Sequence, residues 1–285
     1  MSSAIRIALG QFGRVALLDM DRPLVKHVHA QCHVLIKVEG QDSRFDVGGR
    51  IIDLTDESAL LINAWEHHSY VHQLNQPPTI ILALYIEPRW LALFRGNWRA
   101  SANPGFFPRP GGTITPQMRR QVGAIAEAMI HDPGAAAEHE SLIGKLMVSV
   151  IERCALWRDA APSIRAMADA VGPQDRRILK AVRLMRDNPG AINSMESLAR
   201  ESGLSRAHFF RLFETTTGIA PRIYFNMIRV EQAIQAVAHE DSSFSDLSDN
   251  LGFSLPAHFS RFFHDHAGSS PRVFRAVSAL NRTTS

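Results

Sequence analysis

The chain has 285 residues, of which 45% are hydrophobic and 21% charged, and this composition excludes disordered, collagenous and disulfide-scaffold proteins. The length exceeds a typical single domain of about 100 to 200 residues, so we expect two domains. The net charge of +3 comes entirely from residues 175–285, where 14 Lys and Arg stand against 11 Asp and Glu. Such a small excess is by itself weak evidence for nucleic-acid binding, although 13 of these cations are Arg, which suits bidentate contacts to phosphate or guanine.

Three features of the sequence bear on its compartment. The longest apolar stretch, residues 80–94, is interrupted by Glu87, Pro88 and Arg89, which leaves it too short to span a membrane. The N-terminus lacks the apolar core and cleavage site of a secretion signal. Cys32 and Cys154 lie far apart, as suits reduced thiols. We therefore expect a cytoplasmic protein without a membrane partner.

The first part of the chain reads as β structure. Short apolar or alternating runs are separated by turn signals such as Gly48-Gly49, which favours a sandwich or barrel. Residues 96–116 are rich in Gly, Pro and Asn and predict a loop. The predicted strands cover residues 15–18, 34–38, 44–54, 59–63 and 80–86.

Beyond residue 116 the apolar period becomes that of a helix. A break at residues 131–134 divides the segment into two helices, so residues 116–157 predict a helical hairpin. Its apolar face either covers the barrel or pairs with a second copy of the chain. Residues 158–174 are small, polar and proline-bearing, and we expect the interdomain linker there. The predicted stripes are Met118, Val122, Ile125 and Met129 on the first helix, and Leu142, Leu146, Ser149 or Val150, and Arg153 on the second.

An internal repeat is the strongest signal in the C-terminal part. Leu198, Gly203 and Ser205 recur 49 residues later. Ten coincidences in about 25 positions indicate one supersecondary unit present twice. Seven further residues recur with a shift of 50, namely His208, Phe209, Arg211, Phe213, Gly218, Pro221 and Arg222, which match His258, Phe259, Arg261, Phe263, Gly268, Pro271 and Arg272.

Each repeat predicts a helix-turn-helix, at about residues 194–216 and 243–266. Asn193 or Ser194 caps the first helix of copy one, Ser243 caps that of copy two, and one helix at residues 221–238 joins the copies. We expect the apolar face of the second helices to bury Phe209, Leu212 and Phe213 in copy one and Phe259, Phe262 and Phe263 in copy two.

The outward face of each second helix is the predicted DNA surface, because such a helix can enter the major groove. A helical array used for protein contacts is the alternative. It is disfavoured because Arg211 and Arg261 occupy equivalent outward positions in both copies. The predicted DNA-binding residues are Ser205, Arg206, Ala207, Phe210 and Arg211 in copy one and Ser254, Ala257, His258, Ser260 and Arg261 in copy two.

Residues 175–275 resemble the DNA-binding domain of the AraC/XylS family of bacterial transcription regulators. The resemblance rests on Leu198-Ala199, Ser202 to Ser205, Phe209 to Phe213, Gly218 to Pro221, Tyr224, Arg229 to Ala233, Leu247, Gly252 to Ser254, His258 to Phe263, Gly268, Pro271 and Phe274-Arg275. Two departures stand out. Ser248 occupies a position where the family usually has Ala, and Leu255-Pro256-Ala257 replaces polar residues at the start of the second recognition helix, where methylenes can at most touch a thymine methyl.

The N-terminal part resembles the cupin-like effector and dimerisation domain that many members of this family carry, and the hairpin sits where such members usually dimerise. Its histidines fall into two groups, at residues 27–33 and 67–72. They read as a metal site, as the polar rim of an effector pocket, or as structural histidines. Against a metal, cupin enzymes use a carboxylate shortly after the His-x-His pair, and no Glu follows His29 at that spacing. The predicted pocket residues are His27, His29, Trp65, His68, Tyr70 and His72.

Taken together, the sequence and the resemblance predict a multidomain regulator, controlled by a small-molecule effector, rather than an enzyme. We expect no catalytic residues, metal or other cofactor, and we expect double-stranded DNA, an effector, a second copy and RNA polymerase as partners. A metal-dependent cupin enzyme fused to a DNA-binding domain is the alternative. The expected parts are an all-β cupin-like barrel (1–115), the hairpin (116–157), the linker (158–174) and an all-α domain with two helix-turn-helix units (175–277).

Overall fold

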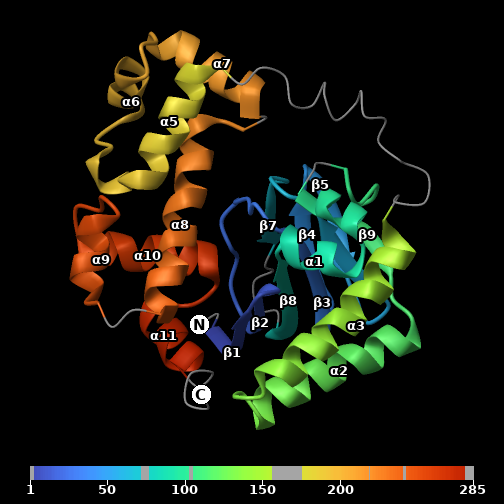
Figure 1. Ribbon diagram of the computed structural model, residues 1–285. Coiled ribbons are helices and arrows are strands. Elements are labelled where there is room, and N and C mark those ends of the chain that lie inside the picture. Colours follow the sequence, from blue (N-terminus) through green and yellow to red (C-terminus); the bar gives the residue numbers. More distant parts are fainter. Residues whose placement is uncertain are drawn as a thin grey trace. The chain divides into compact units, whose positions relative to one another are not determined.

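The computed structural model describes residues 3–71, 77–102, 105–155, 175–217, 219–239 and 242–279. The chain forms two compact units, shown in Figure 1. Unit 1 comprises Met1–Asp159 and Gly268–Ser285, and unit 2 comprises Ala160–Ala267. The linker predicted at 158–174 lies outside the described residues.

Unit 1 is built on two antiparallel sheets, as the alternating runs predict. The expected strand 44–54 is two strands, because Gly48 and Gly49 adopt positive φ values of 59° and 83° and turn the chain. The first sheet has the order β1 (Ser3–Gly10), β2 (Gly13–Met20), β8 (Thr79–Ile86), β3 (Cys32–Gly40), β6 (Ser58–Ile62) and β9 (Gly111–Thr113). The second has the order β5 (Arg50–Leu54), β4 (Ser43–Val47) and β7 (His68–Val71).

The loop predicted at 96–116 is wrong in part. Helix α1 (Pro88–Phe94) is followed by a 3-10 helix, η1 (Gly96–Ala102), and β9 begins at Gly111. Large side chains explain the order in this Gly-rich segment, since Trp98 is 1% exposed and Phe107 2% exposed in the core of unit 1. Burial of such aromatic rings offsets the weak local preferences of their neighbours.

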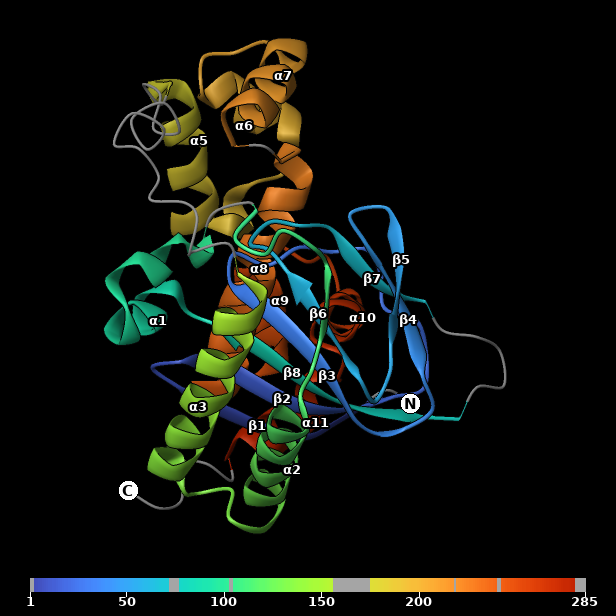
Figure 2. The ribbon, with the colours of Figure 1, turned by 90° about the vertical axis from the view of Figure 1, so that its right-hand side faces the viewer.

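The predicted hairpin consists of α2 (Pro116–His131) and α3 (Ala136–Cys154). The stripe expected on α2 is buried, but on α3 the prediction is partly wrong, because Leu142 is half-buried and Arg153 exposed. The buried face of α3 instead runs through Ile143, Leu146, Met147, Val150 and Ile151. These residues share one core with the first sheet, and Figure 2 shows the two helices beside its strands. The apolar face of the hairpin therefore covers its own sheet.

Unit 2 is helical throughout its described residues. Its elements are α5 (Arg176–Asp187), the 3-10 helix η2 (Pro189–Ala191), α6 (Met195–Glu201), α7 (Arg206–Thr217), α8 (Pro221–His239), α9 (Phe244–Asn250) and α10 (Pro256–Ala267). The last helix, α11 (Pro271–Ala279), belongs to unit 1, where it packs against β1. None of the helices in the described part of the chain is both long and apolar enough to cross a membrane.

Candidate nucleic-acid interface and ligand cavity

The two helix-turn-helix motifs form as the repeat predicts. Ser194 and Ser243 cap α6 and α9, each hydroxyl accepting a hydrogen bond from a first-turn amide at 3.0 Å. The turns after these helices pass through Gly203 and Gly252, whose φ values of 75° and 73° lie in the left-handed region that favours glycine. The second helices of the motifs are α7 and α10.

The inner faces of α7 and α10 are anchored by phenylalanine pairs. Phe209, Phe213, Phe259 and Phe263 are each 0% exposed, as predicted. The rings of each pair lie 5.5 Å and 6.0 Å apart between centroids. The expectation that Leu212 and Phe262 are fully inside is wrong, since both sit at the boundary of the buried face and are half-buried.

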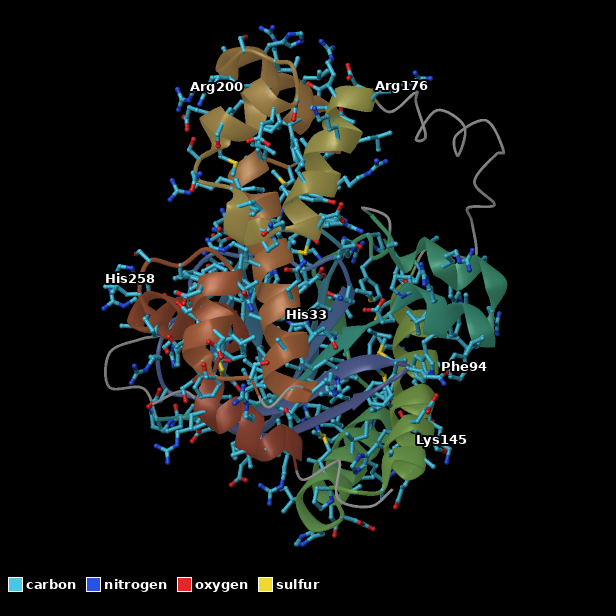
Figure 3. The ribbon with its side chains drawn as sticks, turned by 60° about the vertical axis from the view of Figure 1, so that its left-hand side comes forward. His33, Phe94, Lys145, Arg176, Arg200 and His258 are labelled. Atoms are coloured by element: carbon cyan, nitrogen blue, oxygen red, sulfur yellow. The ribbon has the colours of Figure 1, made fainter. Side chains whose placement is uncertain are left out.

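The predicted DNA-binding residues occupy the opposite side of these helices. Phe210 and Ser260 are half-buried rather than outward, and Phe210 meets the edge of Phe209 with 5.9 Å between ring centroids. Figure 3 shows His258 on the outside of α10. The exposed members are Ser205, Arg206, Ala207 and Arg211 in the first motif and Ser254, Ala257, His258 and Arg261 in the second.

The exposed side chains of the two motifs differ in their hydrogen-bond and ion-pair partners. Arg206 pairs with Glu196 of α6 at 2.5 Å, so its guanidinium is already engaged within the first motif. Ser254 and His258 are joined by a hydrogen bond of 3.0 Å between the hydroxyl and Nδ1. Within the described residues, Arg211 and Arg261 take part in no ion pair. These two guanidinium groups are therefore available to an anionic partner.

Helix α8 connects the motifs and carries a clamp that sequence reasoning missed. The guanidinium of Arg229 lies 3.5 Å from the ring centroid of Phe253 and 5.4 Å from those of Phe225 and Phe262. Burial lowers the pKa of Arg229 to about 10. The cation over these rings ties the connecting helix to the turn and recognition helix of the second motif.

A small cavity lies between the two sheets of unit 1. Side chains alternate between the two faces of β3, so Val34 and Ile36 face the hairpin while His33 and Leu35 face the cavity. The space open to the centre of a water molecule is about 20 Å³. The walls are Leu18, Met20, Leu24, His27, His33, Leu35, Phe45, His68, Tyr70, Ile81 and Tyr85.

Four histidines gather at this cavity. The ring centroids of His27 and His29 lie 4.8 Å apart, and that of His68 lies 4.3 Å and 5.1 Å from them. His33 stacks on Tyr85, with 4.0 Å between ring centroids and 22° between planes. Burial lowers the pKa of His29 and brings those of His33 and His68 to about 3, so these rings are neutral at pH 7.

Most of the predicted pocket residues meet here. His27, His68 and Tyr70 line the cavity, and His29 contacts the rings of His27 and His68. Trp65 does not line it; this residue has a φ of 67°, and its backbone amide donates to the carbonyl of His29 at 2.7 Å. His72 lies outside the described residues.

Sequence reasoning missed two polar members of the site, Tyr85 and Arg14. The guanidinium of Arg14 lies 3.8 Å from the ring centroid of Tyr85 and 5.9 Å from that of Phe274 in α11. A stack therefore runs from His33 through Tyr85 and Arg14 to Phe274. The only signal in the sequence was the alternation of β2 and β8, which does not reveal that these strands pair.

Two family models match the chain, an AraC-like ligand binding domain over residues 20–147 and a helix-turn-helix domain over residues 198–276. The transcriptional activator RhaS of Klebsiella pneumoniae (strain 342) is 26% identical over 254 residues, which cover 87% of this chain and 86% of RhaS. The lactose operon transcription activator of Staphylococcus xylosus is 30% identical over 88 residues, or 31% of this chain and 32% of the activator.

Among solved structures, apo ToxT from Vibrio cholerae matches 95% of this chain and 99% of its own, with a TM-score of 0.57 and 12% identity. ToxT bound to an unsaturated fatty acid matches 96% of each chain, with a TM-score of 0.51 and 11% identity. At these identities the likeness shows the shared two-domain fold.

A β-rich ligand-binding domain joined to paired helix-turn-helix motifs is the architecture of a DNA-binding transcription regulator. The chain belongs to the AraC family of these regulators.

Proposed function

We propose that α7 and α10 read two successive major grooves of one DNA site. The observation that carries this proposal is the equivalence of Arg211 and Arg261, which are exposed at matching positions above buried phenylalanine pairs. Helix α8 runs between the two motifs in Figure 1 and holds them in one unit. Successive grooves on one face of B-DNA lie about 34 Å apart, so the proposed site is bipartite, with about one helical turn between its halves.

We assign base or phosphate contacts to the ten residues predicted from the sequence. Arg211 and Arg261 are proposed to bind guanine or phosphate, whereas Arg206 must first leave Glu196. His258, Ser260 and Ala257 have shorter side chains than arginine and are proposed to make shorter-range contacts. Ser205 and Ser254 precede the helices, where backbone amides can donate to phosphates.

The test begins with selection of bound sequences from random duplexes by the full chain. Affinity for the selected site is then measured by fluorescence anisotropy for Arg211→Ala and Arg261→Ala. Each substitution should weaken specific binding by about 1 to 3 kcal/mol if the side chain is bidentate to guanine, and should relax preference at one base pair. If the contact is to phosphate, binding weakens on all sequences and the salt slope falls by about 1.

The matched control is Arg183→Ala, which removes an exposed arginine of α5 outside both motifs. It should leave affinity within about twofold, because its charge is screened beyond about 10 Å at 0.1 M salt. Unchanged affinity in both Arg211→Ala and Arg261→Ala would remove these helices from the interface. An equal loss of affinity in the control would mean that the effect arises from the lost positive charge alone.

The remaining assignments concern unit 1 and the divisions of the chain. We propose that a small-molecule effector binds the cavity and regulates DNA binding, which requires that the effector bind the DNA-competent and DNA-incompetent states with different affinities.

Because the apolar face of the hairpin covers its own sheet, a homodimer would use the outer side of the hairpin, where Ile130 is 39% exposed. Doubling of the 31.7 kDa mass in sedimentation would support this.

A regulator of promoter DNA is expected to work in the cytoplasm and to meet RNA polymerase there. The divisions 1–115, 116–157, 158–174 and 175–277 remain our proposed domain boundaries. The ligand-binding model spans 20–147, which includes the barrel and most of the hairpin, and the helix-turn-helix model spans 198–276, within the proposed DNA-binding part.

A further inference from the structure

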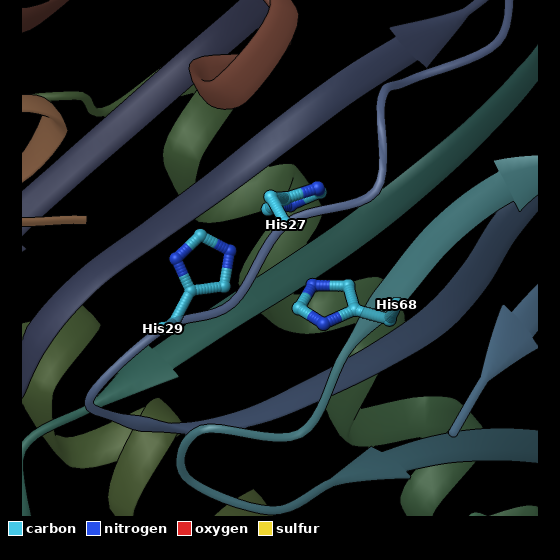
Figure 4. A group of neighbouring side chains, drawn as sticks. All are labelled: His27, His29 and His68. Carbon is cyan, nitrogen blue, oxygen red and sulfur yellow. The ribbon is translucent and has the colours of Figure 1, made fainter. Parts of the chain in front are cut away.

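We infer that His27, His29 and His68 bind one divalent transition-metal ion beside the cavity between the sheets of unit 1. Each of the three residues offers a ring nitrogen, and these three nitrogens lie within 4.8 Å of one another. All three side chains are buried, with 6%, 5% and 2% exposure. Figure 4 shows their rings around one shared space. Metal binding itself does not depend on the proposed function. Only a regulatory role of the metal would rest on the proposal that a ligand at this cavity controls DNA binding.

Hydrogen bonds fix which nitrogen of two rings can bind a metal. Nδ1 of His27 donates to the carbonyl of Val25 at 2.6 Å, and Nδ1 of His68 donates to the carbonyl of Glu66 at 3.0 Å. A carbonyl can only accept, so Nδ1 of each ring carries a proton, and a neutral imidazole with a proton there has its lone pair on Nε2. Metal-binding histidines usually have such an outer partner on the second nitrogen, which fixes the tautomer and the ring direction.

Two nitrogens in the group lack a partner in the described structure. Nε2 of His29 and Nε2 of His68 are both buried without a hydrogen bond. Buried polar atoms are rarely left in this state, because desolvation without compensation is costly. A metal ion at the centre of the group satisfies both atoms at once.

The cavity and its chemistry narrow the occupant. The cavity beside the group, with a volume of about 20 Å³, is large enough for one water-sized particle. Neutral imidazoles favour Zn²⁺, Cu²⁺, Fe²⁺ or Ni²⁺, whereas Mg²⁺ and Ca²⁺ prefer oxygen. Among the described residues, no Asp or Glu joins the three histidines in this group.

A fourth histidine lies next to the three. His33 follows His29 by four residues, and its ring centroid lies 5.2 Å from those of both His29 and His68. Nδ1 of His33 donates to the carbonyl of Leu84 at 3.0 Å, so this ring too has its lone pair on Nε2.

A buried water molecule is the competing occupant. Water can donate to the two nitrogens without a partner, whereas a metal ion can also bind a ring nitrogen of His27, which lies within 4.8 Å of the other two. Zinc binds nitrogen at 2.0–2.1 Å in tetrahedral geometry, which sets ligand nitrogens about 3.4 Å apart. Binding therefore draws the rings together, and it links the segment before β3 to β7 of the second sheet.

The test uses untagged full-length protein that has been treated with a chelator, in the absence of DNA. Co²⁺ is titrated while visible absorption is followed, because its intensity reports coordination geometry, and Zn²⁺ is then added to displace it. We expect one equivalent of metal per chain and a rise in the melting temperature of unit 1. Copper electron paramagnetic resonance of the wild-type chain should show coupling to at least three imidazole nitrogens.

The variants are His29→Ala and His68→Ala, with His67→Ala as the matched control. His67 neighbours His68 in the chain but is only half-buried and outside the group. Metal affinity should fall at least a hundredfold in the first two variants and stay within twofold in the control. If either variant fails to fold, the nitrogen count of the wild-type chain decides.

Three results would overturn the inference: no binding of Co²⁺, Zn²⁺ or Cu²⁺ to the folded wild-type chain, fewer than three imidazole nitrogens, or equal binding by His29→Ala and His68→Ala. The first result would favour the water molecule. Because DNA is absent throughout, failure here leaves the proposed DNA contacts intact, and failure of the DNA selection leaves the metal site intact.

Discussion

The equivalent glycines of the two motifs provide a matched comparison. Gly203 and Gly252 have almost the same φ, 75° and 73°, so replacement by alanine strains the backbone equally. Their surroundings differ. A Cβ on Gly203 would meet nothing within 4 Å, whereas a Cβ on Gly252 would lie 3.1 Å from Cα of Gly190. Gly252→Ala should therefore cost more than Gly203→Ala.

The expected magnitudes follow from these contacts. The left-handed conformation costs a non-glycine residue about 1 to 2 kcal/mol. Reduced entropy of the unfolded chain returns about 0.4 to 1 kcal/mol, so Gly203→Ala should lower the free energy of unfolding by about 1 kcal/mol. Overpacking against the backbone near Gly190 adds about 1 to 3 kcal/mol, which brings Gly252→Ala to about 2 to 4 kcal/mol.

Urea unfolding followed by far-ultraviolet circular dichroism measures both variants. With a slope of about 2 kcal/mol per molar urea, the midpoint of unit 2 should fall by about 0.5 M for Gly203→Ala and about 1 to 2 M for Gly252→Ala. The sequence of unit 2 contains no tryptophan, so tryptophan fluorescence does not report on that unit and serves as a separate probe. Equal midpoint shifts in the two variants would refute the steric argument.

Three further substitutions or reactions probe the packing. Phe213→Ala should lower the free energy of unfolding of unit 2 by about 3 to 5 kcal/mol, because the ring is 0% exposed, and native-like melting would mean that the faces of α7 are misassigned. Arg229→Lys should lower the free energy of unfolding of unit 2 by about 1 kcal/mol, because an ammonium cannot stack on aromatic rings as a planar guanidinium does. The control, Arg222→Lys on the exposed side of α8, should change this free energy little in the same denaturation assay. Burial raises the pKa of Cys32 and of Cys154, so a thiol reagent at pH 7 should modify neither cysteine quickly. Cys32 is 0% exposed and should react only when the protein unfolds. Rapid release of two equivalents of chromophore would contradict this expectation.

The DNA-binding half was largely predictable because its signals are local. A repeated glycine marks each turn, and phenylalanines at i and i+4 mark each buried face, so the helices containing Phe209 and Phe259 could be placed without tertiary information. The errors are at the edge of those faces, at Leu212 and Phe262, which were expected inside, and at Phe210 and Ser260, which were expected outside. There, the boundary depends on which neighbouring helix covers the side chain.

The cavity was less predictable because strand pairing brings its walls together. His27 and His68 could be grouped by residue type, but Tyr85 and Leu18 enter from β8 and β2, and alternation within a strand does not say which strand pairs with it. The ordered segment at 96–102 was missed for a related reason. Trp98 is fixed by the core of unit 1, not by its glycine-rich neighbours.

The stack from the cavity to α11 has a consequence for signalling. Tyr85 is a wall of the cavity, Arg14 lies over its ring, and Phe274 lies next in the stack, in the helix that follows the second motif along the chain. Phe274 is 0% exposed, so no solvent lies beside its ring. A ligand that displaces Tyr85 would therefore also disturb the packing of α11 on β1, and α11 is the helix that follows α10, for which we propose DNA contacts.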